Sequence, residues 1–444
     1  MDGAKSIKLD LGKLDYLQKL TLSVVDDSRI RPGVSLFDLQ GGIQLQEQVT
    51  TMPCVNQTGI TLIRPGGWAC YPAFWIRDLA MSLDSDAVGL DELKAMIRLT
   101  ASSQNGPEAL RMDDAFVPAF AVPDHINLDG SPVYFPGTYS SGTDQGGGIW
   151  GRIPPYCDYF YFIEMVDYYV RKSGDSGFLN ETIQGVTLIE RLEQAFLVPE
   201  YEPSSGIVKT SLERRAVNFG FNDSIVQSGY LLFATLLKYR AALMLADLLP
   251  ASGAAGSQNA DYREIAEKIK QNLPTIFGDK SGWLIASTEC GKQQDVWGTV
   301  YAVYLGLLEG SYLDQALQAI REGYLNGTTC YQGNVRHIPT TNDYSQTSAW
   351  EKTATDYPKN VYQNGAYWAA PVGWYAYALS EIEPELATEL VEVYIAGIQG
   401  EDYRDLHGEG APWECLHPEG EYRQNGVYMV SVALPYAVFK EMAV

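Results

Sequence analysis

Residues 159–170 have the sequence Tyr-Phe-Tyr-Phe-Ile-Glu-Met-Val-Asp-Tyr-Tyr-Val, a helix-length segment that is apolar on nearly every side. A helix that is hydrophobic all round has to be buried all round. The next helical segment is of a different kind, because Leu188, Leu192 and Phe196 repeat with the period of a helix that has one apolar face. A buried helix followed by a surface helix predicts an inner and an outer layer, joined as a helical hairpin.

The same alternation runs along most of the chain. Segments that are apolar on nearly every side recur at 225–249, 296–308, 367–379 and 427–439, and a shorter first one spans 78–87. One-sided segments recur at 90–101, 262–273, 313–324 and 386–393. The outer helix that completes the sixth hairpin is either a helix near 14–24 or a stub after Phe439. The pattern predicts an all-α fold, an (α/α)6 barrel built from six helical hairpins.

Similar clusters of residues mark the starts of the six buried segments. They are centred on Asp78, Asp158, Asp223, Asp295, Gly365 and Asn425, which are 60 to 80 residues apart. This spacing indicates a degenerate internal repeat. Because each cluster precedes an inner helix, we expect all six to meet at one end of the barrel.

Long loops rich in Gly and Pro lead into several inner helices, notably 124–155 and 328–360. Loops of this length in a compact domain commonly carry function. We therefore expect them at the active-site end of the barrel. Alternating apolar residues at Ile43, Leu45 and Val49 predict a small β-hairpin on the flank. On this basis the chain divides into an N-terminal extension, 1–64, with a short helix and this hairpin, and a barrel domain, 65–444.

The composition argues against several classes of protein. The chain has 55 Asp and Glu against 32 Lys and Arg, a net charge of −23, so it lacks the basic surface that nucleic acid requires. It has no apolar run long enough to predict a membrane span. The first five residues show no apolar signal-like region, which leaves a cytoplasmic protein or an exported one whose signal has been removed.

The metal-binding and nucleophilic motifs are also missing from the sequence. The four histidines, His125, His337, His407 and His417, include no pair with i, i+4 spacing, which argues against a zinc site or a Ser-His-Asp hydrolase. The acidic and amide residues Asp124, Asn127 and Asp129 do not have the spacing of a calcium loop. Six cysteines without C-x-x-C spacing are expected to be unpaired thiols. We expect no metal and no cofactor.

Asp and Asn at the start of a helix are commonly N-caps, because their side chains accept hydrogen bonds from the free amides of the first turn. Capping does not explain why Trp, Tyr, Arg and Gln accompany them here. Carboxylates, amides and aromatic faces at one end of a barrel are suited to a neutral sugar, since the polar groups bind hydroxyls and the rings stack on pyranose faces.

These features together resemble the six-hairpin (α/α)6-barrel glycosidases, which include glucoamylases, trehalases and processing α-glucosidases. The resemblance covers about residues 70–442. Its best motif is Trp75-Ile76-Arg77-Asp78, which is similar to the W-x-R-D motif whose Arg and Asp hold the sugar in glucoamylase-like enzymes. The stretch Gln363-Asn364-Gly365-Ala366-Tyr367-Trp368 also resembles the QNG-x-x-W segment before late inner helices in several of these families.

Glycoside hydrolysis uses one protonated carboxyl and one carboxylate on opposite sides of the scissile bond, about 6.5–9.5 Å apart in inverting enzymes. In the resembling enzymes the acid begins the third inner helix, which implies Asp223 here, and the base lies in the loop before the sixth. That loop holds Glu409, Glu414, Glu419 and Glu421, of which we favour Glu414. Glu289 and Asp295 compete for either role, and Asp158 competes for that of the acid.

The resemblance implies that Trp75, Arg77 and Asp78 bind the terminal sugar. The other residues expected to line its pocket are Asp158, Asn222, Glu289, Asp295, Trp297, Asn364, Tyr367, Trp368 and Trp413. The expected function is an inverting, exo-acting glycoside hydrolase that acts on an α-linked oligosaccharide. Two alternatives stay open: a sugar isomerase or epimerase that uses His407 and His417, and a barrel that binds carbohydrate without catalysis.

Overall fold

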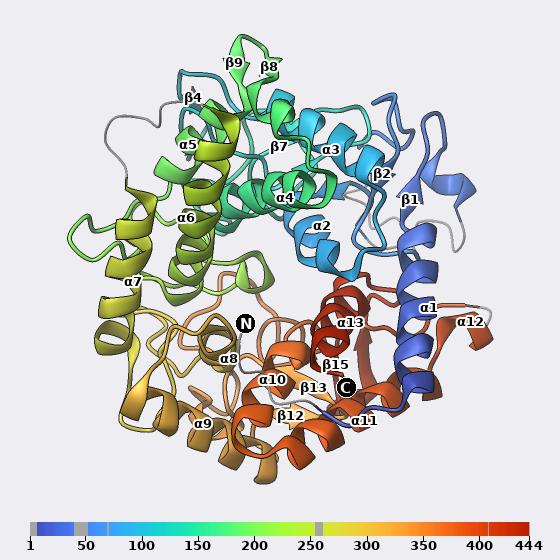
Figure 1. Ribbon diagram of the computed structural model, residues 1–444, viewed down its shortest axis with the longest axis vertical. Helices are drawn as coiled ribbons and strands as arrows, with labels where there is room; N and C mark the ends of the chain where they lie inside the picture. The colour runs from blue at the N-terminus through green and yellow to red at the C-terminus, as the bar shows by residue number, and fades with distance from the viewer. Residues whose placement is uncertain (1–6, 40–51, 69–70, 254–260, 407, 444) are drawn as a thin grey trace.

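The buried segments form a closed ring of six helices in the computed structural model, which describes residues 7–39, 52–68, 71–253, 261–406 and 408–443. The six inner helices are α2 (Ile76–Ser82), α4 (Cys157–Ser173), α6 (Leu232–Ser252), α8 (Val296–Tyr304), α10 (Val372–Ile382) and α13 (Val430–Met442). Each packs against the next, and α13 packs against α2 (Figure 1). This contact closes the ring.

A second set of helices surrounds the first. The outer helices are α3 (Leu90–Ser103), α5 (Leu188–Leu197), α7 (Tyr262–Phe277), α9 (Gly310–Leu325), α11 (Pro384–Gly400) and α1 (Leu11–Asp27). Each of them packs against at least one inner helix, and α1 packs against α13 (Figure 1). The ring is therefore completed by the N-terminal helix, the first of the two possibilities that the sequence left open. The arrangement confirms the predicted double layer of helical hairpins.

Two inner helices begin later in the chain than the sequence predicts. The third was expected from residue 225 and the fifth from residue 367, whereas α6 begins at Leu232 and α10 at Val372. The intervening residues include short strands, β11 (Gly229–Tyr230) and β14 (Tyr367–Trp368). A short apolar run has no periodicity that separates a buried strand from a buried helix, which explains the error.

The loops contain more β-structure than an all-α prediction allows. A five-stranded antiparallel sheet has the order β12 (Cys330–Tyr331), β13 (Asn334–Arg336), β14, β15 (Cys415–His417), β16 (Tyr422–Gln424). A three-stranded sheet has the order β3 (Phe74–Trp75), β6 (His125–Ile126), β7 (Pro132–Val133). Both sheets are built from segments that precede inner helices, so they hold the loops that carry the predicted site residues.

The remaining strands form two-stranded pairs. These are β1 (Arg29–Ile30) with β2 (Leu62–Ile63), β4 (Leu110–Arg111) with β5 (Phe116–Val117), β8 (Thr182–Ile183) with β9 (Val186–Thr187), and β10 (Lys209–Thr210) with β11. The β1–β2 pair provides part of the expected N-terminal flank, but Ile43, Leu45 and Val49 lie outside the described residues. The domain boundary at residue 64 stays a prediction.

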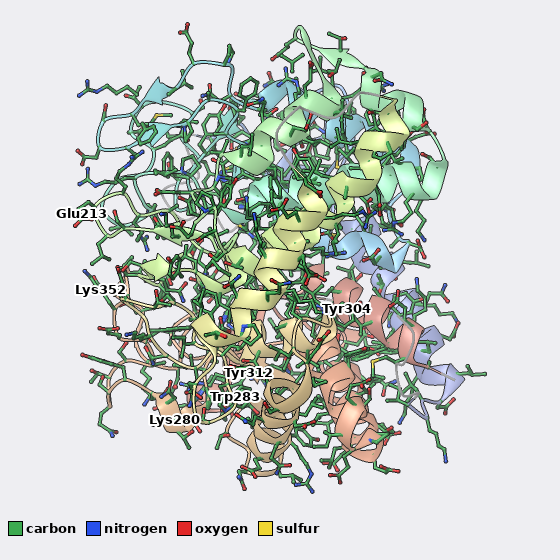
Figure 2. The ribbon with its side chains drawn as sticks, turned by 60° about the vertical axis from the view of Figure 1, so that its left-hand side comes forward. Glu213, Lys280, Trp283, Tyr304, Tyr312 and Lys352 are labelled. Atoms are coloured by element: carbon green, nitrogen blue, oxygen red, sulfur yellow. The ribbon has the colours of Figure 1, made fainter. Side chains whose placement is uncertain are left out.

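The loops gather at one end of the ring. Figure 2 shows Glu213 and Lys352 among the loops on one side of the molecule, and Tyr304, at the end of α8, on the other. The first turns of α2 and α4 also meet, because Asp78 and Asp158 both contact Arg77. None of the described helices is long and apolar enough to cross a membrane. Within the described part of the chain, the cysteines form no disulfide.

Candidate active site

Arg77 lies at the centre of a buried cluster of carboxylates at the loop end of the ring. Its guanidinium is 3.2 Å from Asp124, 3.5 Å from Asp158 and 3.6 Å from Asp78. The backbone of Gly220 passes so close that a Cβ there would lie 2.0 Å from the guanidinium carbon. Only glycine therefore lets this loop approach Arg77, and the predicted Arg77–Asp78 pair is brought together with Asp158.

Asp124 is a functional candidate that sequence reasoning missed. Its Oδ1 accepts a hydrogen bond from Arg77 Nη1, and its Oδ2 accepts one from Trp75 Nε1 at 3.1 Å. His125 Nδ1 lies 2.8 Å from the same Oδ2, and the imidazole stacks on Trp75 with ring centroids 4.3 Å apart. Trp75 and His125 are cross-strand neighbours in the β3–β6 pair, which explains the stacking.

The pKa values of the acids around Arg77 are shifted in different directions. Burial opposes the charge on Asp124, but Arg77 and His125 outweigh it and lower its pKa. Burial raises the pKa of Asp158 well above its ordinary value, although Arg77 acts in the opposite direction. The pKa values of these two acids beside one cation are therefore shifted in opposite directions.

The candidate acid, Asp223, lies in the loop before α6 and directly follows the short helix η5 (Gly220–Asn222). The expectation that it begins the third inner helix is wrong, since α6 starts later. Gln363 holds this loop in place, because its Oε1 accepts hydrogen bonds from the backbone N and the Oγ of Ser224 at 2.8 and 2.7 Å. Burial raises the pKa of Asp223 to about 7, against the lowering effect of Arg77.

The candidate base, Glu414, is the buried acid of its loop. It is 1% exposed, whereas its competitors Glu409, Glu419 and Glu421 are exposed. Tyr71 OH donates to its two carboxylate oxygens at 2.9 and 3.0 Å, and Asn425 Nδ2 donates to Oε2. Burial raises the pKa of Glu414 to about 8, the donors Asn425 and Tyr71 lower it, and the charges of Asp78 and Asp223 raise it further.

Three residues that surround Glu414 have an unusual backbone. Tyr71, Tyr362 and Asn425 have φ values of 50°, 48° and 46°, which lie in the left-handed region. Tyr362 OH is 3.4 Å from Glu414 Oε1 and 2.9 Å from Tyr71 OH. Each such residue costs of order 1–3 kcal/mol, and strain of this kind concentrates at functional sites.

A group of aromatic rings lies beneath Arg77 and is centred on Phe221. Arg77 is 5.6 Å above the Phe221 ring, which packs edge-on against Trp368 at 5.7 Å and is tilted against Trp297 at 6.2 Å. Trp297 is fully buried and stacks on His337, whose pKa burial lowers to about 3. Trp297 therefore packs in the core of this group.

Buried polar atoms without a hydrogen-bond partner are concentrated at this end of the described structure. They include Arg77 Nε, His125 Nε2, Asp158 Oδ1, Tyr159 OH, Asn222 Oδ1 and Trp368 Nε1. Native proteins pair nearly all of their buried polar groups, with water or ligand when not with protein. The set supplies both donors and acceptors, as a polyhydroxy ligand requires.

Several residues expected in the sugar pocket make structural contacts. Asp295 caps α8, since its Oδ1 accepts from Gly298 N at 2.8 Å, and burial raises its pKa to about 7. Asn364 supports the adjoining loop by accepting from Ala349 N at 2.9 Å. Glu289 is exposed and bonds Ser228, and Tyr367 stacks on His417. Their roles in substrate binding stay predictions.

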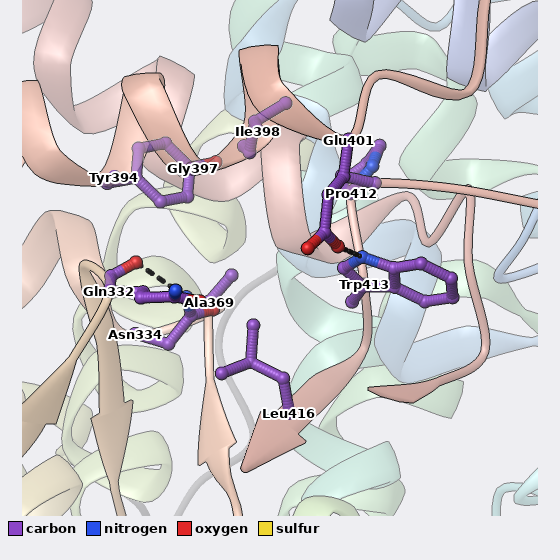
Figure 3. Close-up of a pocket in the computed structure, with 11 residues that line it drawn as sticks. Gln332, Asn334, Ala369, Tyr394, Gly397, Ile398, Glu401, Pro412, Trp413 and Leu416 are labelled. Atoms are coloured by element: carbon purple, nitrogen blue, oxygen red, sulfur yellow. Dashed lines mark hydrogen bonds between the residues drawn. The ribbon is translucent and has the colours of Figure 1, made fainter. Parts of the chain in front are cut away.

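The indole of Trp413 makes its hydrogen bond to Glu401, at the end of α11. Figure 3 shows its indole turned toward Glu401 on the α11 side, where Nε1 donates to Glu401 Oε2 at 2.6 Å. It lines a cavity between α11 and the five-stranded sheet, together with Gln332, Tyr394 and Leu416. This cavity is separate from the cluster around Arg77.

The alternative of an isomerase or epimerase that uses His407 and His417 stays a prediction. His407 lies outside the described residues, and His417 Nδ1 accepts a hydrogen bond from Glu419 N at 3.0 Å. In the described ranges of the chain, no group of three or more His, Cys, Asp or Glu side chains is arranged to hold a metal ion.

Comparisons with known proteins identify the fold. The sequence matches no protein-family model, and no curated protein sequence matches it. Among solved structures, a GH63 mannosylglycerate hydrolase from Thermus thermophilus in complex with glucose is 12% identical with a TM-score of 0.57, over 96% of this chain and 100% of that protein. A cellobiose 2-epimerase from Spirochaeta thermophila is 13% identical with a TM-score of 0.52, over 97% of each chain.

A rhamnosidase from Klebsiella oxytoca with rhamnose bound is similar over 99% of this chain, with 11% identity and a TM-score of 0.53. The present chain spans 66% of that protein. These likenesses establish the architecture, which agrees with the motifs found in the sequence. The chain shares the fold of these solved structures, a double ring of helical hairpins.

Proposed function

We propose that the protein is an exo-acting, inverting glycoside hydrolase for an α-linked oligosaccharide, with Asp223 as general acid and Glu414 as general base. The observation that carries this proposal is the convergence of these two carboxyls. They come from loops far apart in the sequence, and both pKa values are raised by burial, to about 7 and about 8. The charge of Asp223 acts on Glu414, and both act on Tyr362.

The hydrogen-bond donors support the assignment of roles within the pair. The two pKa values are too close to order the groups, and the titration belongs to the pair as a whole. Tyr71 and Asn425 donate to Glu414, and donors favour the ionised form that a base needs. We therefore assign the attacking water to Glu414 and the proton that reaches the leaving oxygen to Asp223.

The charges around Arg77 favour a neutral sugar. Arg77 is already within 3.6 Å of three carboxyl groups, and Glu414 and Asp223 add further acidic groups to the site. An anionic substrate would meet an acidic surface without an unengaged cation among the described residues of this cluster. The similar Thermus protein is named for mannosylglycerate, which is anionic. We propose that the present protein acts on uncharged glycosides.

The test is a panel of aryl-glycosides and disaccharides, read for released sugar and for its initial anomeric form by NMR. We expect hydrolysis with inversion. The variants Asp223→Asn and Glu414→Gln should each lose about 10²–10⁴-fold in kcat. Asp314→Asn, an exposed acid on α9, serves as the matched control and should retain full activity.

The other outcomes separate the alternatives. Retained anomeric configuration would contradict inversion while leaving hydrolysis intact. Epimerised sugar that persists in Asp223→Asn would favour the epimerase, a function for which the Spirochaeta protein is named. Sugar binding without turnover, unchanged in both acid variants, would favour a barrel that only binds carbohydrate.

A further inference from the structure

His125 is a buried residue of the Arg77 cluster to which the proposed reaction assigns no role. Its side chain is 1% exposed. It stacks on Trp75 and meets Tyr139 edge-on, with ring centroids 5.5 Å apart. Two rings therefore fix the plane of the imidazole, and with it the directions in which its two nitrogens can form hydrogen bonds.

The neighbours of Asp124 determine the proton on one nitrogen. Asp124 Oδ1 accepts from the Arg77 guanidinium, and Oδ2 accepts from Trp75 Nε1. Both of these partners are donors only, and the Arg77 cation stabilises the ionised carboxylate, which has no proton to give to His125. His125 Nδ1, 2.8 Å from Oδ2, must therefore be the donor. In the neutral ring the other nitrogen, Nε2, is then an acceptor.

That acceptor has no hydrogen-bond partner among the described residues, although its atom is buried. Two other atoms of the cluster that lack a hydrogen bond are held in ion pairs, Arg77 Nε with Asp78 at 3.6 Å and Asp158 Oδ1 with Arg77 at 3.5 Å. Arg77 connects both to His125 through Asp124. His125 Nε2 is therefore the atom of this cluster that a ligand can satisfy, and a sugar hydroxyl can donate the one hydrogen bond that it needs.

We propose that His125 is a sugar-binding residue whose Nε2 accepts a hydrogen bond from a hydroxyl of the bound sugar, with Asp124 holding the ring in the required tautomer. The inference rests on the proposed glycosidase function for its substrate class. It predicts that the protein discriminates against the sugar that lacks this one hydroxyl, because the acceptor is then left buried and unpaired.

The first experiment requires no catalysis. Long-range 1H–15N NMR on the whole protein distinguishes protonated from unprotonated imidazole nitrogens, and four histidines can be assigned by substitution. We expect a proton on Nδ1 of His125 and none on Nε2. Titration with D-glucose, D-mannose and L-rhamnose should move the Nε2 resonance with at least one sugar. A protonated Nε2, or a resonance that none of the three moves, would overturn the proposal.

The second experiment measures discrimination with the best substrate of the panel and its monodeoxy analogues. His125→Phe keeps a ring on Trp75 and should lower kcat/KM by about 10–100-fold. With the wild type, the kcat/KM of one deoxy analogue should fall by a similar factor relative to the parent substrate. With His125→Phe, the same analogue and the parent substrate should have equal kcat/KM. His125→Gln, which retains an acceptor, should recover part of the loss. Tyr304→Phe, at the opposite end of α8, is the control.

The results that would refute the role of His125 differ from those that would refute the proposed function. If the wild type releases no sugar, the glycosidase proposal falls, and the NMR titration still decides the role of His125. If the wild type hydrolyses glycosides but every deoxy analogue loses the same factor with wild type and His125→Phe, the role of His125 is refuted and the reaction stands.

Discussion

Several residues at the loop end of the barrel have conformations or burial that lower the stability of the fold, and they lie in the candidate active site. Glu414 is buried with only polar uncharged donors in hydrogen-bond contact, and Tyr71, Tyr362 and Asn425 around it adopt left-handed backbone conformations. Neither feature helps folding, since buried charge and positive φ both carry a cost. Both features instead hold one carboxylate in a fixed, desolvated position.

The first prediction concerns the pH dependence of stability. The pKa of Glu414 is about 8 in the folded protein against an ordinary value of 4.5, so the folded state holds a proton that the unfolded chain loses. The free energy of unfolding therefore falls as the pH rises through this range. We expect Glu414→Gln to be about 2–4 kcal/mol more stable than wild type near pH 8 and equal to it near pH 4.

Urea unfolding at several pH values, followed by tryptophan fluorescence, measures this difference. Glu385→Gln, an exposed acid in the first turn of α11, is the control and should leave the pH dependence unchanged. Parallel stability curves for the wild type and Glu414→Gln would contradict the raised pKa of Glu414 in the folded protein.

The second prediction concerns the protonation of Glu414 during catalysis. The kcat/KM profile of the wild type should be bell-shaped, with its maximum between the pKa values of about 7 and about 8. Tyr71→Phe removes a donor to both oxygens of Glu414, so the pKa of Glu414 should rise. We expect a limb of the profile to move upward by about one pH unit. Tyr304→Phe should leave the profile in place, and an unmoved profile in Tyr71→Phe would show that this hydroxyl does not tune Glu414.

At the scale of elements, short strands support the site together with the first turns of α2 and α4. The β3–β6 pair places Trp75 beside His125. Strand β14 contains Trp368 and pairs with β15, which directly follows Glu414. The five-stranded sheet begins with a tight hairpin, in which Gln332 and Gly333 both have positive φ. Two such residues correspond to a type I′ turn, which matches the twist of the strands.

The third prediction tests how this hairpin packs against α11. Gly333 has a φ of 73°, and a Cβ there would lie 2.3 Å from the Tyr394 Cα. We expect Gly333→Ala to cost about 3 kcal/mol or more, from backbone strain plus the clash. Gly185, in the β8–β9 turn, has a φ of 83° with nothing within 4 Å of its Cβ position.

Gly185→Ala therefore isolates the backbone strain and should cost about 1–2 kcal/mol. Denaturant midpoints of the two variants measure the comparison. An equal loss of unfolding free energy in the two variants would mean that α11 moves to accept the extra methyl group. The hairpin would then not be packed rigidly against α11.

At the scale of the whole molecule, the first outer helix and the last inner helix complete one ring. Helix α1 buries Leu17, Leu20 and Val24 and packs against α13, although they lie at opposite ends of the described chain. Tyr428, just before α13, donates a hydrogen bond to Asp78 of α2. Closing the ring therefore also joins the last loop to the Arg77 cluster.

The fourth prediction concerns this closure. Leu20 is fully buried, and Leu20→Ala should lower the free energy of unfolding by about 2–5 kcal/mol. Because α1 supports α13, we expect amide exchange to accelerate in 430–442 before it does so in 232–252. Hydrogen exchange with mass spectrometry measures both regions. Leu11→Ala, at a side chain that is 74% exposed, should change neither, and uniform acceleration around the ring would contradict a local role for α1.

Much of the candidate site follows from the sequence because its motifs precede buried helices. Arg77, Asp78, Asp158 and Glu414 could be named from motif and position, and the structure brings them to one end of the ring. Asp124 and His125 could not, since they lie in a Gly- and Pro-rich loop without a periodic pattern. Trp413 is next to Glu414 in the chain, yet its indole donates to Glu401, because adjacency in the chain does not fix the direction of a side chain.

The sequence by itself determined which helices are buried, because apolar periodicity reports burial directly, and hence the double ring. Only the tertiary structure decided which polar residues share the site, which cap helices and which loops form sheets. Hydrogen bonds such as those of Asp124 with Trp75 and Arg77 join residues distant in the chain. Such pairings depend on loop geometry, which leaves no periodic trace in the order of the amino acids.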